Sequence, residues 1–397
     1  MNFIQKFFKK NPPHRLAIID DSIPNNNPFG FRNYEFNLIL KALPSADIWT
    51  MSVTFPGKEA WFRHSYGQEY KAWKQNKKAY LKHYPENKSR LHWLNPKKSY
   101  TFDLAYSIFL CTTYTLLPFY EKNQIPFVFV LYPGGGFGLN NPSSDAMLRK
   151  ICQSPYFKGV ICTQPVTYQY LLDKKFVSRE KIFYQFGGYL QFQPEDIPSK
   201  LYYPTDKSSI DICFVGGKYS PKGIDKGYDL FINTAKALVT KYSFLHFHVV
   251  GNFNEKDIPI DGFENRITFH GILNAGQLSK LYRTMDICLS PNRPFMLFDG
   301  NFDGFPLGVE ATSFGIALMT TDELNNNQGN YQDGKELIVI RPDLDDILSK
   351  IKPLIENTQK LYEVGKNGAE KTFKIMNPVE RANNIIEFLK QNLMEVK

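Results

Sequence analysis

Residues 210–238, IDICFVGGKYSPKGIDKGYDLFINTAKAL, contain the pattern on which the predicted fold depends. The stretch opens with the apolar run IDICFVGG, which predicts a buried strand that ends in two glycines. After a turn rich in glycine and lysine, apolar residues recur at helical spacing from Asp229 onward. A buried strand followed by a turn and a helix is the repeating unit of a parallel α/β sheet.

The same unit recurs along both halves of the chain. Short apolar runs that predict buried strands alternate with helical patterns. In sequence order these runs are RLAIIDDS (15–22), FDLAYSIFL (102–110), IPFVFVLYPGGG (125–136), FLHFHVVGN (244–252), ITFHGIL (267–273), DICLSPN (286–292) and IALMTTD (316–322). Between the halves, residues 194–209 are polar and contain three prolines, as is typical of a linker.

We therefore predict an α/β protein of two Rossmann-like, doubly wound domains that face each other across a cleft. The N-terminal domain spans residues 1–195, a linker spans 196–208, and the C-terminal domain spans 209–377. Residues 378–397 follow an Asn-Pro break and predict a last helix, which we expect to pack back on the N-terminal domain. Ligands of such sheets bind at the carboxyl ends of the strands, so the site is expected in the turns that follow them.

Composition and cysteine spacing restrict the class of protein. The chain of 397 residues is 43% hydrophobic and 22% charged, which is typical of a soluble globular protein. Its five cysteines lie far apart and form no CxxC pair, which argues against a disulfide framework and a cysteine metal site. No apolar run approaches the roughly 20 residues that cross a bilayer. We therefore expect a cytoplasmic protein, located at the inner face of the membrane if its N-terminus binds lipid.

Basic and aromatic residues gather in residues 61–100 of a chain whose net charge is +9. The N-terminus, MNFIQKFFKKNPP, also combines apolar and basic residues. Both features predict an anionic partner, either a membrane surface or an acceptor, whereas no motif predicts nucleic-acid binding. The alternative is a solvated helical face whose aromatic rings pack inward, together with a frayed terminus. The basic residues of the segment are Arg63, Lys71, Lys74, Lys77, Lys78, Lys82, Lys88, Arg90, Lys97 and Lys98.

The turn after residues 210–217 is the first candidate for ligand binding. Gly216 and Gly217 let a ligand approach the backbone, and a lysine at this edge can neutralise a phosphate. Three lysines are available here, Lys218, Lys222 and Lys226. The alternative interpretation is a solvated turn, since glycine and lysine are common between a strand and a helix.

The stretch DGFPLGVEA (303–311) is the second candidate, because it places backbone N–H groups at the start of a predicted helix. Asp303 precedes that helix and Glu310 is expected two turns inside it, so both carboxylates can accept hydrogen bonds from hydroxyl groups. A nucleotide sugar has phosphates between two polyhydroxylated parts and would use both candidate loops. Taken singly, Asp303 is equally explained as a helix cap and Glu310 as an exposed helix residue.

The order of these motifs resembles the nucleotide-sugar-binding half of GT-B-fold glycosyltransferases of the class called glycosyl transferases group 1, or family four. The segments that carry the resemblance cover roughly residues 208–392 and are more specific together than any is alone. They are FVGG…KG.D, HVVGN, ITFHGIL, DGFPLGVEATSFGIALMTTD and DGKELIV.

The resemblance implies roles for individual residues. The first acid of the family signature, here Asp303, lies by the donor sugar, and the second, here Glu310, binds the ribose. Six residues separate the two acids in this chain, whereas the family has seven. The family places an arginine and a lysine on the diphosphate, and the lysine position corresponds to either Lys222 or Lys226. We therefore take Asp303, Lys222 and Lys226 as catalytic candidates.

The remaining implied positions bind the donor. Gly217 stands where the family arginine is expected, and the backbone of Ile272 would meet the nucleobase. In the N-terminal domain, Arg32 is a candidate phosphate partner, and Tyr132 occupies the place where many members carry a histidine. The full set of donor-binding candidates is Gly30, Gly216, Gly217, Lys218, Ile272, Gly304, Phe305, Pro306, Leu307 and Glu310.

The resemblance implies a retaining glycosyltransferase that needs no cofactor or metal, with a nucleotide diphosphate-sugar as co-substrate. Its acceptor would be a hydroxyl of a glycan or a lipid-linked molecule, as in cell-surface polysaccharide or glycolipid synthesis. One alternative is a nucleotide-sugar epimerase or a phosphorylase with the same fold. The other is a non-catalytic protein that binds a membrane or a polyanion, motivated by the shortened acidic spacing and the missing histidine.

Overall fold

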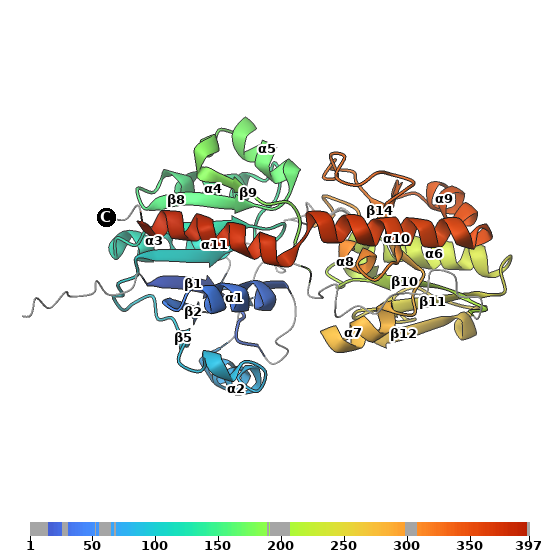
Figure 1. Cartoon of the computed structure of the whole chain (residues 1–397), viewed down its shortest axis with the longest axis horizontal. Helices are drawn as coiled ribbons and strands as arrows, with labels where there is room; N and C mark the ends of the chain where they lie inside the picture. The colour runs from blue at the N-terminus through green and yellow to red at the C-terminus, as the bar shows by residue number, and fades with distance from the viewer. Residues whose placement is uncertain are drawn as a thin grey trace, which may run out of the picture.

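The protein consists of two parallel sheets that lie side by side, each covered by helices on both faces (Figure 1). The computed structural model describes residues 15–25, 31–51, 53–54, 65–66, 69–188, 190, 207–297 and 308–394. The architecture confirms the predicted pair of Rossmann-like α/β domains.

The first sheet has seven parallel strands in the order β5-β2-β1-β6-β7-β8-β9. The central strands β1, β6 and β7 are buried at every position, which explains their continuous apolar sequences. The strands are β1 (Leu16–Asp20), β2 (Ala46–Thr50), β5 (Leu91–Trp93), β6 (Leu104–Ile108), β7 (Phe127–Leu131), β8 (Phe157–Cys162) and β9 (Ile182–Tyr184).

Helices from both ends of the chain cover this sheet. One apolar core contains residues of α3 (Leu110–Lys122), α4 (Pro142–Gln153) and α5 (Pro165–Asp173). The core on the opposite face contains residues of α1 (Phe31–Ala42) and of the C-terminal helix α11 (Pro378–Met394). The last helix of the chain therefore completes the hydrophobic core of the first domain.

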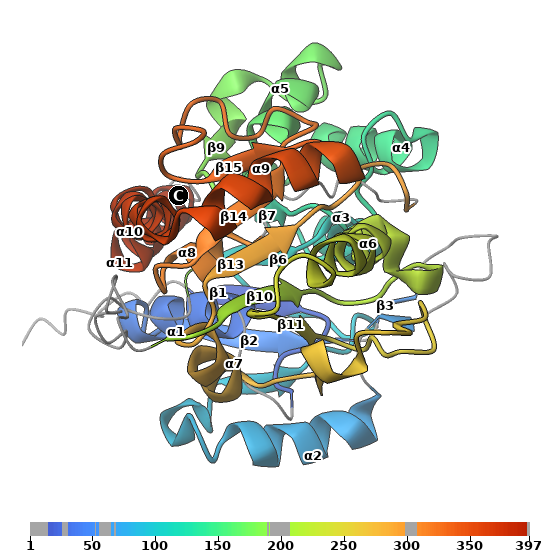
Figure 2. The same ribbon diagram turned by 90° about the vertical axis from the view of Figure 1, so that its right-hand side faces the viewer.

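A separate helix, α2 (Tyr70–Tyr80), lies at one margin of the molecule, beyond β5 (Figure 2). Two short strands precede it, β3 (Val53–Thr54) and β4 (Ser65–Tyr66), and a 3₁₀ turn, η2 (Pro85–Asn87), follows it. A second 3₁₀ turn, η3 (Arg179–Lys181), leads into β9. In the described ranges, no helix combines the length and the apolar character needed to span a bilayer.

The second sheet has six parallel strands in the order β12-β11-β10-β13-β14-β15. The chain runs outward from β10 to β12 and then returns to β13, which lies beside β10. The strands are β10 (Ile210–Val215), β11 (Leu245–Val250), β12 (Ile267–Gly271), β13 (Ile287–Ser290), β14 (Ala317–Thr321) and β15 (Ile338–Ile340).

Two apolar cores flank this sheet as well. The core on one face contains residues of α6 (Tyr228–Val239), α9 (Leu344–Glu356) and α10 (Thr358–Ile375). The other contains residues of α7 (Ala275–Tyr282) and of the four-residue helix α8 (Val309–Thr312). Two 3₁₀ turns, η5 (Pro221–Lys226) and η6 (Glu264–Arg266), precede α6 and β12.

The helices α10 and α11 connect the two domains, and Figure 1 shows the pair running across both. Arg381 of α11 is 2% exposed and donates hydrogen bonds to the carbonyl oxygens of Gln185 (3.0 Å) and Phe186 (2.6 Å), just after β9. Ile385 and Leu389, on the next turns of α11, pack into the apolar core beside α1. Because a buried guanidinium needs acceptors, these carbonyl groups fix where α11 docks.

The carboxyl edges of the two sheets meet directly at one contact. The backbone N–H of Val166, which follows β8 at the start of α5, donates to Oδ1 of Asn326, which follows β14, over 3.4 Å. Asn326 is fully buried, and its own backbone is held by the carboxylate of Asp322. Turns that follow strands of both sheets therefore approach each other, as ligand binding between two Rossmann-like domains requires.

Candidate functional site

The site begins where the strand order of the second sheet reverses, between β10 and β13. The connection from β10 leads to β11 on one side, whereas the connection from β13 leads to β14 on the other side. A crevice forms at the carboxyl ends of two such strands, and ligands of doubly wound sheets bind there. The residues that follow the two strands are Gly216 and Pro291.

Three glycines allow the backbone segments around Gly216 to approach one another closely. The Gly216 N–H donates to the carbonyl of Val250 over 3.1 Å, and the Gly251 N–H donates to the carbonyl of Gly271 over 2.9 Å. Gly251 has φ = +128°, and a Cβ atom there would lie 1.9 Å from the Gly216 carbonyl oxygen. The glycines at 216, 251 and 271 therefore form a row across the ends of β10, β11 and β12.

Lys226 lies directly beside the first glycine of this row. A Cβ atom on Gly216 would be 3.7 Å from Cγ of Lys226. The lysine is only 7% exposed, and its Nζ lies 5.5 Å from the centre of the Tyr219 ring. The stem of its side chain thus runs beside backbone that has no side chain, and a lysine next to bare backbone is an arrangement that suits phosphate groups.

The turn that carries Lys226 is closed by side-chain contacts. Ser220 and Asp225 bond reciprocally, since the Ser220 N–H donates to Asp225 Oδ1 (3.2 Å) and the Asp225 N–H donates to Ser220 Oγ (3.2 Å). Gly227 then begins α6 with φ = +71°, and a Cβ atom there would lie 2.1 Å from the Pro291 carbonyl oxygen. The start of α6 therefore rests directly against the end of β13.

Arg293, which follows β13, fixes the same turn, a role that was not predicted from the sequence. Its guanidinium binds both carboxylate oxygens of Asp229 (2.7 and 3.0 Å) and the carbonyl oxygen of Ile224 (3.0 Å). Its backbone N–H donates to the carbonyl of Asp225 over 3.0 Å. A bidentate arginine–carboxylate pair holds a defined geometry, so Arg293 determines where Lys226 and the start of α6 lie.

The other two lysines of the turn are placed differently. The Lys218 ammonium group contacts both carboxylate oxygens of Asp257 (2.8 and 2.9 Å), and its backbone N–H donates to Asn252 Oδ1 (2.8 Å). Lys222 is exposed and has a left-handed backbone (φ = +57°). Of the three lysines, only Lys226 is buried beside Gly216, while Gly217, the predicted counterpart of the family arginine, packs against Tyr219.

Glu310 lies near the same end of β13. Gly308, two residues before it, has φ = +85°, and a Cβ atom there would be 3.4 Å from the side chain of Ser290. Gly308 and Gly227 therefore pack on the consecutive residues Ser290 and Pro291, which brings the two candidate loops to one place. The helix itself differs from the expectation: α8 begins only at Val309, after the left-handed Gly308, so Glu310 is in its first turn and not two turns inside.

The carboxylate of Glu310 also lies close to Tyr282 of α7. Burial of the Tyr282 ring, and next the charge of Glu310, raise the pKa of this phenol well above its ordinary value. Glu310 itself is partly exposed, so it can contact a ligand. The candidates Gly30, Asp303, Gly304, Phe305, Pro306 and Leu307 lie outside the described residues.

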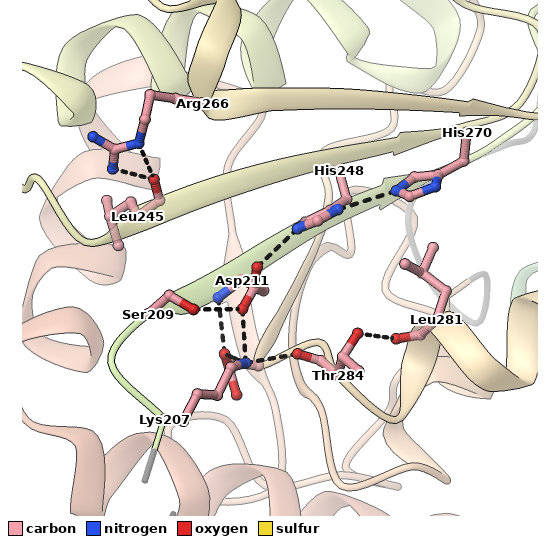
Figure 3. A network of polar contacts seen from close by, with 10 residues as sticks. Lys207, Ser209, Asp211, Leu245, His248, Arg266, His270, Leu281 and Thr284 are labelled. Atoms are coloured by element: carbon pink, nitrogen blue, oxygen red, sulfur yellow. Dashed lines mark hydrogen bonds and ion pairs between the residues drawn. The ribbon is translucent and has the colours of Figure 1, made fainter.

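Ile272 and two histidines occupy the outer end of the glycine row. Ile272 follows β12 and is 78% exposed. The imidazole rings of His248 and His270 are hydrogen-bonded at 3.0 Å, and His248 also contacts Asp211 at 2.8 Å (Figure 3). The expectation that the backbone after β12 is accessible to a nucleobase is consistent with this exposure.

The candidates in the N-terminal domain are engaged within the protein. Arg32 contacts the carboxylates of Asp20 (2.8 Å) and Asp21 (2.9 Å), so its charge is already offset. The Tyr132 hydroxyl donates to Glu35 over 2.9 Å, and burial, followed by the charge of Glu35, raises the pKa of this tyrosine well above its ordinary value. A buried phenol of this kind is a poor proton donor or acceptor for a substrate.

Over the described parts of the chain, no group of three or more His, Cys, Asp or Glu side chains could hold a metal ion.

Comparison with known proteins identifies the domain that carries this site. Residues 209–357 match the family model described as Glycosyl transferases group 1. The matched residues form most of the second domain, in which Gly216, Lys226 and Glu310 lie. The chain as a whole has the two Rossmann-like domains of the GT-B arrangement. Among the curated proteins no match was found.

Several solved structures share the fold over nearly all of the chain. Anabaena HepE, solved in complex with UDP, is 16% identical with a TM-score of 0.65, covering 95% of this chain and 100% of HepE. Sucrose-phosphate synthase from Thermosynechococcus elongatus is 14% identical with a TM-score of 0.63, covering 95% and 98% of the two chains. A glycosyltransferase from Rickettsia africae is 13% identical with a TM-score of 0.66, covering 96% and 99%.

Proposed function

We propose that this protein is a glycosyltransferase that moves a sugar from a nucleoside diphosphate to a hydroxyl of a glycan or lipid-linked acceptor, with retention at the anomeric carbon. The observation that carries the proposal is the position of Lys226, buried beside Gly216 at the point where the strand order reverses. A glycine backbone, a buried lysine and a helix start at one strand end form a site for a diphosphate.

The donor diphosphate would lie against Gly216 and Gly217, with Lys226 and the first turn of α6 supplying positive charge. We favour Lys226 over Lys222 because its side chain lies along Gly216, whereas Lys222 is exposed. Lys218 would have to leave Asp257 in order to reach a phosphate. HepE, which shares the fold, was solved with UDP-glucose, so uridine diphosphate sugars are the first donors to test.

Glu310 would accept hydrogen bonds from the ribose hydroxyls, since ionised carboxylates bind vicinal hydroxyls well. The partial exposure of Glu310 and the packing of Gly308 on Ser290 support this role. We assign Asp303, and the backbone of residues 304–307, to the sugar and diphosphate. Ile272 would lie beside the nucleobase, and Gly30 would approach the phosphates from the N-terminal domain.

Catalysis would depend on stabilising the departing diphosphate. As the bond from the anomeric carbon to the phosphate oxygen breaks, negative charge grows on the diphosphate, where Lys226 and the N-terminus of α6 are already placed. The acceptor oxygen bonds to the same face of the anomeric carbon, and its proton passes to the departing phosphate oxygen. Because the two domains hold donor and acceptor together, orientation lowers the barrier further.

The acceptor side of the proposal rests on α2. Trp73 and Tyr80 pack inward, as the solvated-face interpretation predicts, whereas Tyr70 is 49% exposed with the Lys74 ammonium 4.5 Å from its ring centre. A helix with exposed lysines and no acidic residue in its first turn attracts anions. We propose that this face contacts an anionic acceptor or the anionic lipid around it.

The proposed function is tested by incubating the protein with UDP-, GDP-, ADP- and CDP-sugars, with and without a panel of glycan and lipid-linked acceptors. The proposal predicts transfer from at least one donor, with the anomeric configuration of the product matching that of the donor. An inverted product, or a donor that is only isomerised without an acceptor, would contradict it. In the second case the protein would be an epimerase.

A further inference from the structure

Three neighbouring strands of the second sheet, β10, β11 and β12, contribute a continuous chain of hydrogen bonds (Figure 3). Asp211 of β10 contacts Nε2 of His248 on β11 through Oδ1 at 2.8 Å. Nδ1 of His248 then contacts Nε2 of His270 on β12 at 3.0 Å. The second nitrogen of the His270 ring, Nδ1, points away from His248 (Figure 3).

The first member of this chain is an ionised carboxylate. Burial acts to raise the pKa of Asp211, but hydrogen bonds from His248 and from Lys207 outweigh burial and hold it well below its usual range. The other carboxylate oxygen, Oδ2, receives the Lys207 ammonium at 2.9 Å and the Ser209 hydroxyl at 3.1 Å. Asp211 can therefore only accept hydrogen bonds, on both of its oxygens.

When both imidazoles are neutral, an acceptor at one end fixes the proton positions along the whole chain. Since Asp211 accepts, the proton of neutral His248 must be on Nε2, which leaves Nδ1 of that ring as an acceptor. His270 must then donate from Nε2, so its own proton lies there. Nδ1 of His270 is left with a lone pair and no proton. Carboxylate, first imidazole and second imidazole together present a hydrogen-bond acceptor at the end of β12.

This acceptor lies next to the glycine row that borders the proposed diphosphate site. His270 directly precedes Gly271, whose carbonyl accepts from Gly251, and Gly251 packs against the carbonyl of Gly216. Within the described ranges, the only hydrogen bond of His270 side-chain atoms is the one to His248. The ring is partly exposed, and the exposed Ile272 follows two residues later.

We propose that Asp211 and His248 position His270 so that Nδ1 accepts a hydrogen bond from the nucleobase of the donor and selects a base with a ring N–H. Uracil and guanine carry such an N–H on the edge used in base pairing, whereas cytosine and adenine have an unprotonated nitrogen there. The inference rests on the proposed function, because it assumes that the nucleobase lies beside residues 270–272. The inference adds a preference for particular bases to the proposed function, in which only the backbone beside Ile272 meets the nucleobase.

Several charged and titratable groups of the described residues lie around Asp211. They are Lys207, His246 on β11, Asp286 before β13 and Tyr362 of α10. Asp286 accepts from the Asp211 N–H (2.8 Å) and from the Tyr362 hydroxyl (3.2 Å), and it pairs with Lys207. Among the residues that the structure describes, Asp211 is the charged group that is hydrogen-bonded to the two imidazoles, so this carboxylate determines the direction of their hydrogen bonds.

Two variants test the proton positions and the base preference separately. In His270→Gln, the glutamine amide can still form a hydrogen bond to His248, but no acceptor remains at the position of the histidine Nδ1. Asp211→Asn is isosteric and reverses the chain, because Lys207 and Ser209 require the amide oxygen and turn the NH₂ group toward His248. The His270 ring would then carry its proton on Nδ1. His246→Asn is the matched control, since His246 lies on the same strand and outside the chain.

The measurements are ¹⁵N shifts of the histidine rings in the free protein and calorimetric affinities for UDP, GDP and CDP. We expect His270 to be protonated at Nε2, and UDP or GDP to bind at least about tenfold more tightly than CDP. His270→Gln should remove the preference for UDP or GDP over CDP. Asp211→Asn should move the His270 proton to Nδ1 and should reduce or reverse the preference. The control His246→Asn should keep the preference of the wild type. If the wild type binds the three nucleotides equally, or if His270→Gln keeps the preference, the inference about His270 is wrong but the proposed function is unaffected. Protein that binds none of them would overturn the proposed function as well.

Discussion

The side chain of Lys226 runs beside the backbone of Gly216, with Cγ 3.7 Å from the position that a Cβ atom would take on the glycine. The two residues are separated by a turn and a left-handed glycine in sequence, yet both lie at the end of β10. The relationship gives a phosphate bare backbone on one side and a positive charge on the other. A side chain larger than glycine at position 216 would occupy the space between this backbone and the Lys226 side chain.

Gly251→Ala should destabilise the protein strongly, because the new Cβ atom would lie 1.9 Å from the Gly216 carbonyl oxygen at a φ of +128°. We expect a loss of about 3 kcal/mol in the free energy of unfolding, measured with chemical denaturant. Gly262→Ala is the matched control, since Gly262 also has a positive φ (+89°) but nothing lies within 4 Å of its Cβ position. The control should lose only about 1 kcal/mol. Equal losses in the two variants would show that the contact with Gly216 is unimportant.

Glu310→Ala should reduce glycosyl transfer by about 100-fold or more, because the variant leaves the ribose hydroxyls without their charged acceptor. Initial rates with a donor that the wild type uses are the measurement. Glu370→Ala, which removes an exposed acid of α10, serves as the control. Retention of full activity in Glu310→Ala would contradict the proposed site.

Arg293→Lys should raise the KM for the donor about tenfold while changing kcat less. Lysine cannot bind both oxygens of Asp229 and the carbonyl of Ile224 at once, so the turn that carries Lys226 would lose its defined position. A double-mutant cycle with Asp229→Asn should give a coupling energy of about 1–3 kcal/mol in donor binding. Additive effects would mean that Arg293 does not act through Asp229.

The stability that Asp211 contributes should depend on pH. The pKa of Asp211 in the folded state is depressed below the unfolded value of about 3.9. The stability that the carboxylate contributes is therefore fully present above the unfolded pKa and is lost as the pH falls from there through the lower, folded pKa. The difference in unfolding free energy between wild type and Asp211→Asn should be largest above about pH 5 and should shrink toward pH 3. A difference that stays constant over this range would show that the Asp211 carboxylate is not selectively stabilised by folding.

The fold could be predicted from the sequence because its central strands are continuous apolar runs followed by glycines. IDICFVGG became β10 and the two glycines after it, and DICLSPN became β13 and the turn that contains Arg293. The order of the motifs then indicated the family, which the match to residues 209–357 confirms. Local patterns of this kind are fixed by neighbouring residues and can be recognised in a single sequence.

Contacts between distant residues could not be predicted in the same way. The sequence left Lys222 and Lys226 equivalent, because it does not show which lysine returns to Gly216. It also gave no sign that Asp257 binds Lys218, or that Arg293 reaches Asp229, since each pair spans a strand and its connections. The alternating histidines of FLHFHVVGN indicate a half-exposed strand face, but the register between strands decides which imidazoles meet.

The central claim, that Lys226 binds the diphosphate of the donor, is tested most directly by calorimetric titration of UDP and GDP into three proteins. These are the wild type, Lys226→Met and Lys236→Met, which removes an exposed lysine of α6 two turns away. We predict that the wild type binds at least one nucleotide, that Lys226→Met loses about 10- to 100-fold in affinity, and that Lys236→Met binds like the wild type. Unchanged affinity in Lys226→Met, or an equal loss in Lys226→Met and Lys236→Met, would contradict the account.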